Sequence, residues 1–481
     1  MKINFEEPAR LVRPGTFIQE NHYYHKVVNA QISPLVLFFL NMDTDRIIER
    51  YCHLNPRVNS DALTQYLNYR PNHIQWSGTD LFHVTTANGK RQMVVIETNS
   101  SPSGQKSMPL LFDQEEMGSY QRLIETSFLP FVKEKRVVSG HYAVVYDKNE
   151  MEASGYAAAL AQITGEDVYL ASFYDGDPNP SVRFVDEVME VRDQDANWFP
   201  IKAAIRYVTQ TPWNRIPVKS KTLIYNPIIA CLAGGRNKRM AAKAYDFYNG
   251  DLKNHGLKIN TPETIKDVKL HEIPLWVDRF GGHAVIKNPY SNAGQGVYTI
   301  TCKQELEHFM SLSHPYEDFI VQSLIGNYHW STNSSDGLYY HVGMVPNKKK
   351  EIYVADLRFM IASTANGYRP MAMYARRAEK PLTTNLDSTE DSWQMLGTNL
   401  SIKMIDGWAS ETGRLKLVDQ KDFNQLGLSL DSLIEGYIQS VLSTIAIDKL
   451  AAELINTKKQ LRRKLFMAIN GDPILMDEII S

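Results

Sequence analysis

A pair of strand-like runs joined by a short turn, residues 79–98, constrains the fold of this chain more than any other feature. The runs "TDLFHVTT" and "RQMVVIET" are rich in β-branched and aromatic residues, and "ANGK" between them is typical of a β-hairpin. The second run leads into Glu97 and Asn99, which lie two residues apart and therefore project from one face of a strand. Because Asp80 stands on the paired strand, the sequence predicts three oxygen-bearing side chains close together.

Two interpretations of Glu97 and Asn99 are open at this level. An ordinary strand end, with Glu97 in a salt bridge and a surface loop after it, is the commoner fate of a single Glu-x-Asn pattern. A functional site is favoured by Asp80 on the paired strand and by the turn "SSPSG" that follows directly. That turn offers hydroxyl and backbone N–H groups as hydrogen-bond donors.

The composition limits the class of partner. Lys and Arg number 52 against 54 Asp and Glu, a net charge of -2, so no general nucleic-acid or anionic-membrane surface is expected. The three cysteines, Cys52, Cys231 and Cys302, are too scattered for a zinc site or a disulfide framework and favour a reducing compartment. The first twenty residues do not read as a secretory signal, and no apolar run is long enough to span a bilayer. We therefore expect a soluble cytoplasmic protein with a small-molecule partner.

The order of patterns along the 481 residues predicts an α/β protein of several domains. An apolar strand, a polar turn, an Ala-rich helix and a second apolar strand follow one another from about residue 138, which indicates a new α/β unit. The pattern changes again near residues 266 and 346. A long amphipathic helix is predicted at 430–455, and the last stretch, 462–481, reads as two strands about "NGDP".

The stretch "VIKNPYSNAGQGVYTI" reads as two strands joined by a glycine-containing loop. Lys287 ends the first strand, and Gly294 and Gly296 would let backbone N–H groups lie against phosphate oxygens. An ordinary β-hairpin would explain the pattern equally well, and no Gly-Lys-Ser/Thr of a Walker loop is present. The next strand, "FIVQSLIG", ends in Gln322 and Ser323, where an adenine could lie against backbone groups.

Five stretches in this order resemble the motifs of ATP-grasp ligases. They are the Lys287 glycine loop, "FIVQSLIG", "VADLRFMI", "AMYARRA" and "GTNLSIK", and the last three carry Asp356, Arg358, Arg376, Arg377 and Asn399. In that superfamily a strand with a metal-binding Asp and a strand ending in Glu-x-Asn should come next, but here the matching piece is the hairpin near the N-terminus. The order therefore looks circularly permuted, as in eukaryotic glutathione synthetases.

Two further stretches resemble the glutathione synthetase branch. "NPIIACLAGGRNK" looks like the segment that leads to a phosphate-binding lysine; Arg236 stands at that place and Lys238 two residues later, so either could contact ATP. "AAIRYVTQ" resembles the strand with a substrate-binding arginine, here Arg206, for which a surface ion pair is an equal alternative. Gly78 stands where those enzymes have an arginine, which argues against glutathione as the product.

The resemblance implies an α/β (α+β) ATP-grasp fold with circular permutation and an inserted α/β substrate-binding (pre-ATP-grasp) domain. The expected parts are a permuted core with the metal strand, the substrate-binding domain, an ATP-binding lid, and the remainder of the core with C-terminal helices; they span residues 1–137, 138–265, 266–345 and 346–481. Asp477 and Glu478 are a second-ranked alternative for the metal strand, because neither the Asn nor the Ser/Pro/Gly turn accompanies them.

The resemblance also implies chemistry: ATP with Mg²⁺ phosphorylates a carboxylate, and an amine attacks the acyl phosphate. Arg376 and Arg377 are adjacent on a strand and face opposite ways, so only one can reach a phosphate, and Arg377 is preferred. The expected metal ligands are Asp80, Glu97 and Asn99; the fixed positive charges are Lys287, Arg358, Arg377 and Lys238 or Arg236. The expected ATP contacts are Gly294, Gly296, Gln322, Ser323 and Leu324, and the expected substrate contacts are Ser100, Ser101, Ser103, Arg206 and Asn399.

Three functions remain open. The first is a carboxylate-amine ligase acting on amino acids or short peptides, the second a phosphotransferase on the same fold, and the third a nucleotide-binding pseudoenzyme that serves as an interaction platform. Retention of Asp80, Glu97, Asn99 and Lys287 together speaks against the third. A Rossmann-type enzyme is disfavoured because its G-x-G-x-x-G pattern is missing. By resemblance alone, a homodimer is also expected.

Overall fold

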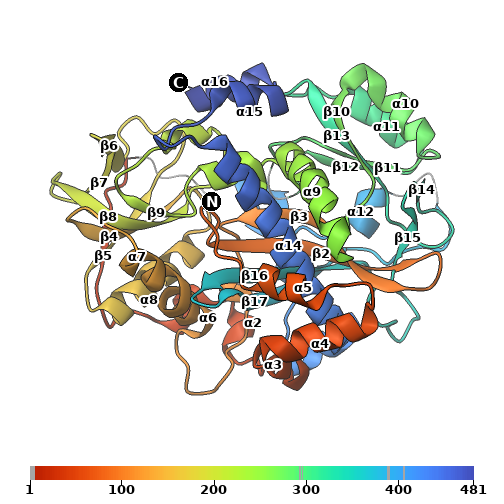
Figure 1. Cartoon of the computed structure of the whole chain (residues 1–481), viewed down its shortest axis with the longest axis horizontal. Coiled ribbons are helices and arrows are strands. Elements are labelled where there is room, and N and C mark those ends of the chain that lie inside the picture. Colours follow the sequence, from red (N-terminus) through yellow and green to blue (C-terminus); the bar gives the residue numbers. More distant parts are fainter. Residues whose placement is uncertain (1–5, 292–293, 295, 387–390, 405–406, 481) are drawn as a thin grey trace.

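The architecture is that of a mixed α/β protein. The structure is a computed structural model, and it describes residues 6–291, 294, 296–386, 391–404 and 407–480 (Figure 1). In this part of the chain the strands form two seven-stranded sheets, one four-stranded sheet and a two-stranded hairpin. The α/β fold class predicted from the sequence is confirmed.

The central sheet is antiparallel and contains the predicted hairpin. β2 pairs with β3 on one side and with β16 and β15 on the other. The pairing of Asp80 with Glu97 and then of Leu81 with Val95 leaves Ile96 as an extra, bulged residue. The strands are β2 (Trp76–Thr86), β3 (Arg91–Ser100), β14 (Asn333–Ser334), β15 (Gly337–His341), β16 (Ala355–Thr364), β17 (Gly367–Arg377) and β20 (Leu415–Lys416).

The long helix α14 (Leu430–Leu454) covers one face of this sheet and confirms the helix predicted there (Figure 1). It is buried along most of its length, because helices pack on its outer side: α3 (Pro34–Leu40), α4 (Thr44–Leu54), α5 (Ser60–Leu67) and α9 (Lys238–Leu252). Small polar side chains of α14 meet the strands. Thr444 Oγ1 lies 2.6 Å from Ser77 Oγ, and Thr98 Oγ1 lies 3.1 Å from Ser443 Oγ.

A second sheet, on the left in Figure 1, has a parallel centre in the order β5-β4-β8-β9, as expected where strand and helix alternate. Helix α8 (Glu150–Thr164) connects β4 to β5 and packs against both. Antiparallel strands complete the edges. The strands are β1 (Arg10–Val12), β4 (His141–Tyr146), β5 (Val168–Ser172), β6 (Val182–Val185), β7 (Val188–Arg192), β8 (Trp198–Tyr207) and β9 (Leu223–Tyr225).

The third sheet is small, antiparallel and covered by two helices, and we call it the lid sheet. Its order is β10-β13-β11-β12, with β10 (Thr264–Lys269), β11 (Ala284–Lys287), β12 (Val297–Ile300) and β13 (Asp318–Ser323). Its core is formed with α10 (Ile273–Arg279) and α11 (Lys303–Ser311), at the upper right of Figure 1. β15 pairs with β2, so this later part of the predicted lid segment belongs to the central sheet.

The prediction of two strands for residues 462–481 is wrong. Two helices lie there instead, α15 (Arg463–Ile469) and α16 (Pro473–Ile480). Pro473 begins α16, and Asp472 Oδ1 accepts hydrogen bonds from the N–H groups of Ile474 and Leu475, so "NGDP" starts a helix rather than turning a hairpin. Glu478 accepts a hydrogen bond from Tyr316 Oη (3.0 Å), which places it away from the pocket described below.

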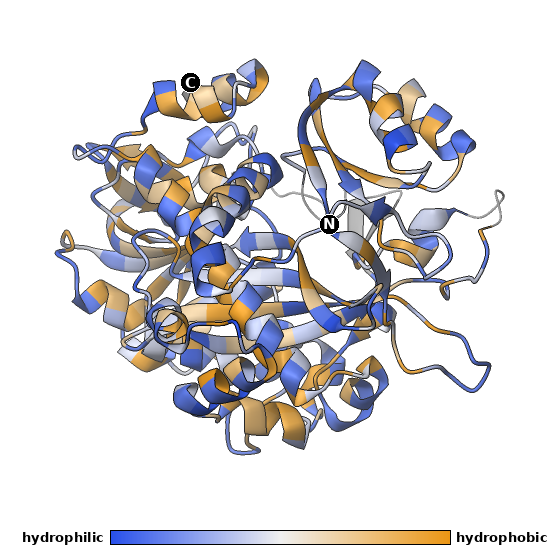
Figure 2. Ribbon diagram, turned by 45° about the vertical axis from the view of Figure 1, so that its right-hand side comes forward, coloured by the Kyte–Doolittle hydropathy of each residue, from blue (hydrophilic) through white to orange (hydrophobic). Residues whose placement is uncertain are grey.

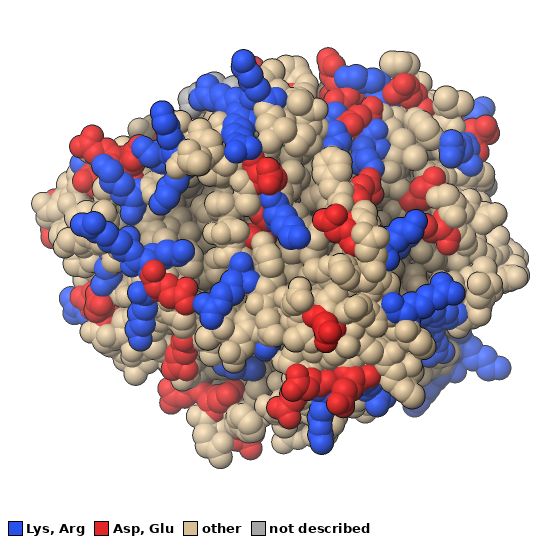
Figure 3. Space-filling view, in the orientation of Figure 1, with Lys and Arg blue, Asp and Glu red and all other residues tan. Residues whose placement is uncertain are grey.

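The remaining elements are short and connect these layers. They are α1 (Gln19–His22), α2 (His25–Val28), α6 (Gly118–Leu123), α7 (Leu129–Lys133), α12 (Ser392–Leu396), α13 (Gln420–Leu426) and the hairpin of β18 (Ser401–Met404) and β19 (Gly407–Ser410). Among the described residues, no helix combines the length and apolarity needed to cross a bilayer. Hydrophobic and hydrophilic residues alternate along the helices (Figure 2). Basic and acidic side chains are interspersed over the face in Figure 3, as the near-zero net charge predicts.

Asp448 of α14 gives a prediction about stability. This buried carboxylate accepts hydrogen bonds from three successive N–H groups, those of Asn72, His73 and Ile74 at 2.7–2.9 Å, and from Tyr69 Oη at 2.8 Å. Asp448→Ala leaves these buried donors unpaired, so we expect the free energy of unfolding to fall by about 2–3 kcal/mol.

Urea unfolding followed by circular dichroism measures this loss. Glu453→Ala, on the exposed side of the same helix, is the matched control and should change stability by no more than about 0.5 kcal/mol. Equal effects of the two substitutions would contradict the role of Asp448.

Candidate functional site

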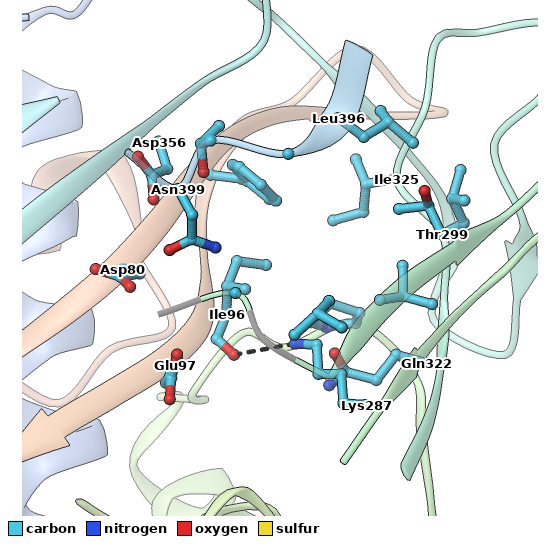
Figure 4. A pocket seen from close by; sticks show the side chains of 18 of the residues that line it. Asp80, Ile96, Glu97, Lys287, Thr299, Gln322, Ile325, Asp356, Leu396 and Asn399 are labelled. Atoms are coloured by element: carbon cyan, nitrogen blue, oxygen red, sulfur yellow. Dashed lines mark hydrogen bonds between the residues drawn. The ribbon is translucent and has the colours of Figure 1, made fainter. Parts of the chain in front are cut away.

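A pocket lies between the lid sheet and the central sheet (Figure 4). Its charged end comes from the central sheet, the start of α9 and the end of β11, and its apolar end lies toward β13 and α12. The charged end contains Asp80, Glu97, Lys238, Lys287, Asp356 and Arg376; the apolar walls include Phe82, Ile96, Val285, Leu324, Ile325, Trp393 and Leu396. A ligand with one flat apolar part and one anionic part matches this division.

Strand register assembles the charged end. Asp80 stands opposite Glu97 of β3 on one side and opposite Arg358 of β16 on the other. The Arg358 guanidinium contacts both carboxylate oxygens of Asp80, at 2.6 and 2.7 Å, and Arg376 Nη2 lies 3.0 Å from Asp80 Oδ2. Arg376 also binds Asp356 with two nitrogens. Four buried charges of alternating sign therefore cross β2, β16 and β17.

Two of the three pocket carboxylates, those of Asp80 and Glu97, are held in their ionised form. Burial alone would raise the pKa of Asp80, but Arg358 and Arg376 outweigh it and hold that pKa well below its usual range. Burial likewise opposes ionisation of Glu97, yet Lys238, Arg236 and Lys287 together lower its pKa.

Two lysines face these carboxylates from different elements. Lys238, at the start of α9, lies 3.3 Å from Glu97 Oε1 and donates to the carbonyl oxygen of Ser291 in the glycine loop. Lys287, at the end of β11, lies 3.5 Å from the carbonyl oxygen of Ile96, the contact drawn in Figure 4. Burial lowers the pKa of Lys287 to about 8, and the nearby charge of Lys238 acts in the same direction. The charges of Glu97 and Asp80 act in the opposite direction. A buried amine in this condition favours an incoming anion.

Four of the five residues predicted to contact ATP line the lid side of the pocket. Gln322, Ser323 and Leu324 line it, and Gly294 approaches Asn399 so closely that a Cβ atom there would lie 2.5 Å from Asn399 Nδ2. Gly294 also has φ +78°, which suits glycine. Gly296 does not line the pocket, and residues 292, 293 and 295 of this loop lie outside the described residues.

The turn after Asn99, residues 100–104, is called the serine turn below. It is mostly buried and is hydrogen-bonded to arginines of other elements. Arg206 of β8 is fully buried and donates to Ser101 Oγ at 3.1 Å and to Ser100 Oγ at 3.4 Å. Arg236 donates to the carbonyl oxygens of both serines, at 3.1 and 3.2 Å. Ser100, Ser101 and Arg206 therefore shape the turn in this structure, and the half-buried Ser103 is the hydroxyl at its outer end.

Glu152 of α8 fixes the outer part of the same turn. It accepts hydrogen bonds from Ser103 Oγ (2.6 Å) and from the N–H groups of Gly104 (2.6 Å) and Gln105 (2.8 Å). Asn149 adds a hydrogen bond to Ser103 Oγ at 2.7 Å. The contact between Glu152 and the serine turn joins residues 47 to 49 positions apart, so no local sequence pattern predicts it.

Of the two adjacent arginines, it is Arg376 and not the expected Arg377 that faces the pocket. Arg376 lines the pocket, whereas Arg377 points to the other side of β17, donates to the carbonyl oxygens of Ala378 and Glu379, and lies over the Tyr353 ring. The expected alternation is present, but the choice of Arg377 is corrected to Arg376. Arg358 does not line the pocket; it lies behind Asp80 and also reaches Tyr374 Oη (3.3 Å).

Lys148 was not singled out by its sequence context. This half-buried side chain follows β4, and burial together with Arg236 and Arg358 lowers its pKa to about 7, against the opposing effects of Asp147 and Glu97. Asp147 itself is occupied, since its Oδ2 accepts from the N–H groups of Thr209 and Gln210 and from Arg215. The structure thus adds an amine that is partly protonated near neutral pH and interacts electrostatically with Arg236, Arg358 and Glu97.

The expected magnesium ligands do not present a common set of open oxygens. Asp80 is bound by two arginines, and Asn99 Oδ1 accepts a hydrogen bond from Arg236 Nη1 at 2.8 Å. Only Glu97 keeps one carboxylate oxygen without a described contact. No group of three His, Cys, Asp or Glu among the described residues is arranged to hold a metal ion. The three-residue site therefore does not fit Mg²⁺ as the side chains stand.

Comparisons with known proteins give matches in structure only. No protein-family model matches the chain, and no curated protein matches its sequence. A glutathione synthetase-like effector from Globodera pallida is 9% identical, with 76% of this chain and 86% of that chain covered and a TM-score of 0.38. A RimK domain ATP-grasp protein from Sphaerobacter thermophilus is 12% identical (62% and 99% covered, TM-score 0.30).

D-alanyl-alanine synthetase A from Vibrio cholerae is also 12% identical, with 55% of this chain and 94% of that chain covered and a TM-score of 0.32. The circular permutation stays a prediction.

Glu152 gives a prediction about the serine turn. In Glu152→Gln an NH₂ group replaces one carboxylate oxygen. The turn then loses the hydrogen bonds that this oxygen accepts, either from the Gly104 and Gln105 amides or from Ser103. We expect hydrogen exchange at these two amides to accelerate by about tenfold or more.

Hydrogen exchange read by mass spectrometry on peptides covering 101–108 measures this change. Glu150→Gln lies on the same helix but pairs with an exposed arginine, Arg10, and should leave these amides unchanged. Unaltered exchange in both variants would show that Glu152 does not hold the turn.

Proposed function

We propose that this chain is an ATP-dependent carboxylate-amine ligase that forms a peptide or amide bond through an acyl phosphate, releasing ADP and phosphate. The observation that carries the proposal is the pocket's division into an apolar end under the lid sheet and a charged end at Asp80, Glu97, Lys238 and Lys287. Adenine suits the first end, beside Gln322 to Leu324, and a polyphosphate suits the second.

In the first step the chain's own residues bind and orient the phosphates. Lys238, Lys287 and Arg376 bring positive charge from three separate elements to one place, which stabilises charge that spreads over the transferred phosphoryl group. Arg358 contacts Asp80 and lies 3.5 Å from the Ser103 carbonyl oxygen, so it joins the phosphate end to the serine turn. The glycine loop, with Gly294 and Gly296, closes against water.

The carboxylate substrate is assigned to the serine turn. Arg236 and, when protonated, Lys148 supply positive charge nearby, whereas the Ser103 hydroxyl already donates to Glu152. Ser100, Ser101 and Arg206 act by shaping this turn, and Asn399 faces the glycine loop from the opposite wall. In the second step a neutral amine attacks the acyl carbon, phosphate leaves, and the nitrogen loses its extra proton. We propose amino acids or short peptides in the cytoplasm as substrates.

One observation favours a second function. Both oxygens of Asp80 are held by arginines, as expected if the chain binds a nucleotide without turnover and serves as an interaction platform. A phosphotransferase would use the same pocket with a single acceptor. The three functions differ in which molecules are needed for ADP to form.

The deciding measurement is ADP release from Mg-ATP with pooled amino acids and amines. We expect release only when a carboxylate and an amine are both present, and a loss of about tenfold or more in Lys287→Met, because that variant lacks a cation at the phosphates. Lys349→Met, in an exposed loop, is the matched control.

The outcomes separate the candidates. ADP that forms with the carboxylate alone, together with a stable phosphorylated product, identifies a phosphotransferase. ADP binding without release identifies the pseudoenzyme. A Lys287→Met protein that is as active as wild type would refute the assignment of the phosphate end.

The lowered pKa of Lys287, about 8, predicts a pH dependence of nucleotide binding. The anion binds the charged ammonium, which dominates below this pKa and is lost as the pH rises through it. Between pH 7 and pH 9 the dissociation constant of ADP should therefore rise by about tenfold. Calorimetric titrations at several pH values measure the slope, and Lys287→Met should flatten it. A wild-type affinity that is constant over this range would contradict the prediction.

A further inference from the structure

The carboxylate expected to be the centre of a metal site is already neutralised by protein groups. Arg358 binds Asp80 with a fork geometry, at 2.6 and 2.7 Å, and Arg376 adds a third contact at 3.0 Å. Arg358 lies directly opposite Asp80 in the sheet, and Arg376 is itself held by Asp356. Such planar, bidentate pairs are specific in geometry and strong. The pairing of β2 with β16 therefore holds Arg358 against the oxygens of Asp80, and no loop has to move to form this contact.

Asn99 is committed in the same way. Its side-chain oxygen accepts from Arg236 Nη1 at 2.8 Å, and that guanidinium is fixed further by the carbonyl oxygens of Ser100 and Ser101. Turning Asn99 toward a metal would break this contact in a buried place, because only 3% of Asn99 is exposed. Glu97 is left as the single candidate ligand, and Lys238 lies 3.3 Å from one of its oxygens.

The cations around this end exceed the carboxylates. Two arginines neutralise Asp80 and Asp356, and Lys238 lies beside Glu97. Lys287 makes no ion pair among the described residues, since its ammonium contacts only a carbonyl oxygen. Arg236 adds its charge behind the serine turn. An anion that enters here meets a surplus of fixed positive charge.

We propose that this end of the pocket binds the polyphosphate of a nucleotide through protein cations alone, so that nucleotide binding does not depend on a divalent metal. The inference rests on the nucleotide pocket proposed above. Arginine and lysine groups take the place that magnesium has where free carboxylates meet phosphates. The charge balance favours the free nucleotide, which is more negative than its magnesium complex.

Calorimetric titration of the full chain with ADP tests this, once in buffer with EDTA and once with excess Mg²⁺. We expect the two dissociation constants to agree within about tenfold. ADP that binds more than about tenfold more weakly in EDTA overturns the inference. If ADP binds in neither buffer, the nucleotide pocket itself is refuted, which separates that failure from failure of the inference.

Two variants examine the carboxylates directly. In Glu97→Gln and Asp80→Asn we expect the ratio of the EDTA and Mg²⁺ dissociation constants to stay within about tenfold of one, because neither side chain acts through a metal. A loss of affinity confined to the Mg²⁺ buffer would identify a metal ligand and overturn the inference. Glu97 has one open oxygen, so Glu97→Gln decides the question even where Asp80→Asn does not fold. Asp431→Asn, at an exposed position, is the matched control.

Discussion

The row of ion pairs across β2, β16 and β17 is the interaction on which the central sheet and its pocket depend. Asp80, Arg358, Arg376 and Asp356 are nearly excluded from water, so each charge needs its neighbour. Removing one partner of such a pair costs about 3–5 kcal/mol, because an unpaired charge stays buried. The pairing also fixes which residues face each other across the three strands. Sheet register and charge pairing therefore support each other, and both orient the pocket.

A second set of buried contacts joins the central sheet to the α/β layer at the serine turn. Arg206 comes from β8, Glu152 from α8 and Arg236 from the segment before α9, and all three bind the turn that ends β3. These layers cannot move apart near the turn without breaking several buried hydrogen bonds. The lid sheet is tied to α9 by ion pairs: Arg239 lies 3.0 Å from Asp318 of β13 and also contacts Asp267 of β10, and Lys243 lies 2.8 Å from Asp267.

Local sequence patterns predict the elements but not their partners. The period of two in a strand placed Glu97 and Asn99 on one face, and the helical period located α14. The pairing of Asp80 with Arg358 joins residues 278 apart and follows from strand order, which no local pattern contains. The bulge at Ile96 and the choice between Arg376 and Arg377 likewise depend on register. Proximity of oxygen ligands was predictable from the hairpin, whereas their occupation by guanidinium groups was not.

The same electrostatics link the ligand-free pocket to its proposed ligand. Lys287 is buried, and its lowered pKa shows that its charge is incompletely compensated by Glu97 and Asp80, which are engaged by other cations. An anion placed between Lys287 on the lid and Lys238 on α9 would relieve this shortage and would draw the two elements together. Free energy gained there would hold the lid sheet and α9 to the same anion. The surplus of positive charge in the pocket is thus a physical reason for an anion to bind between these two elements.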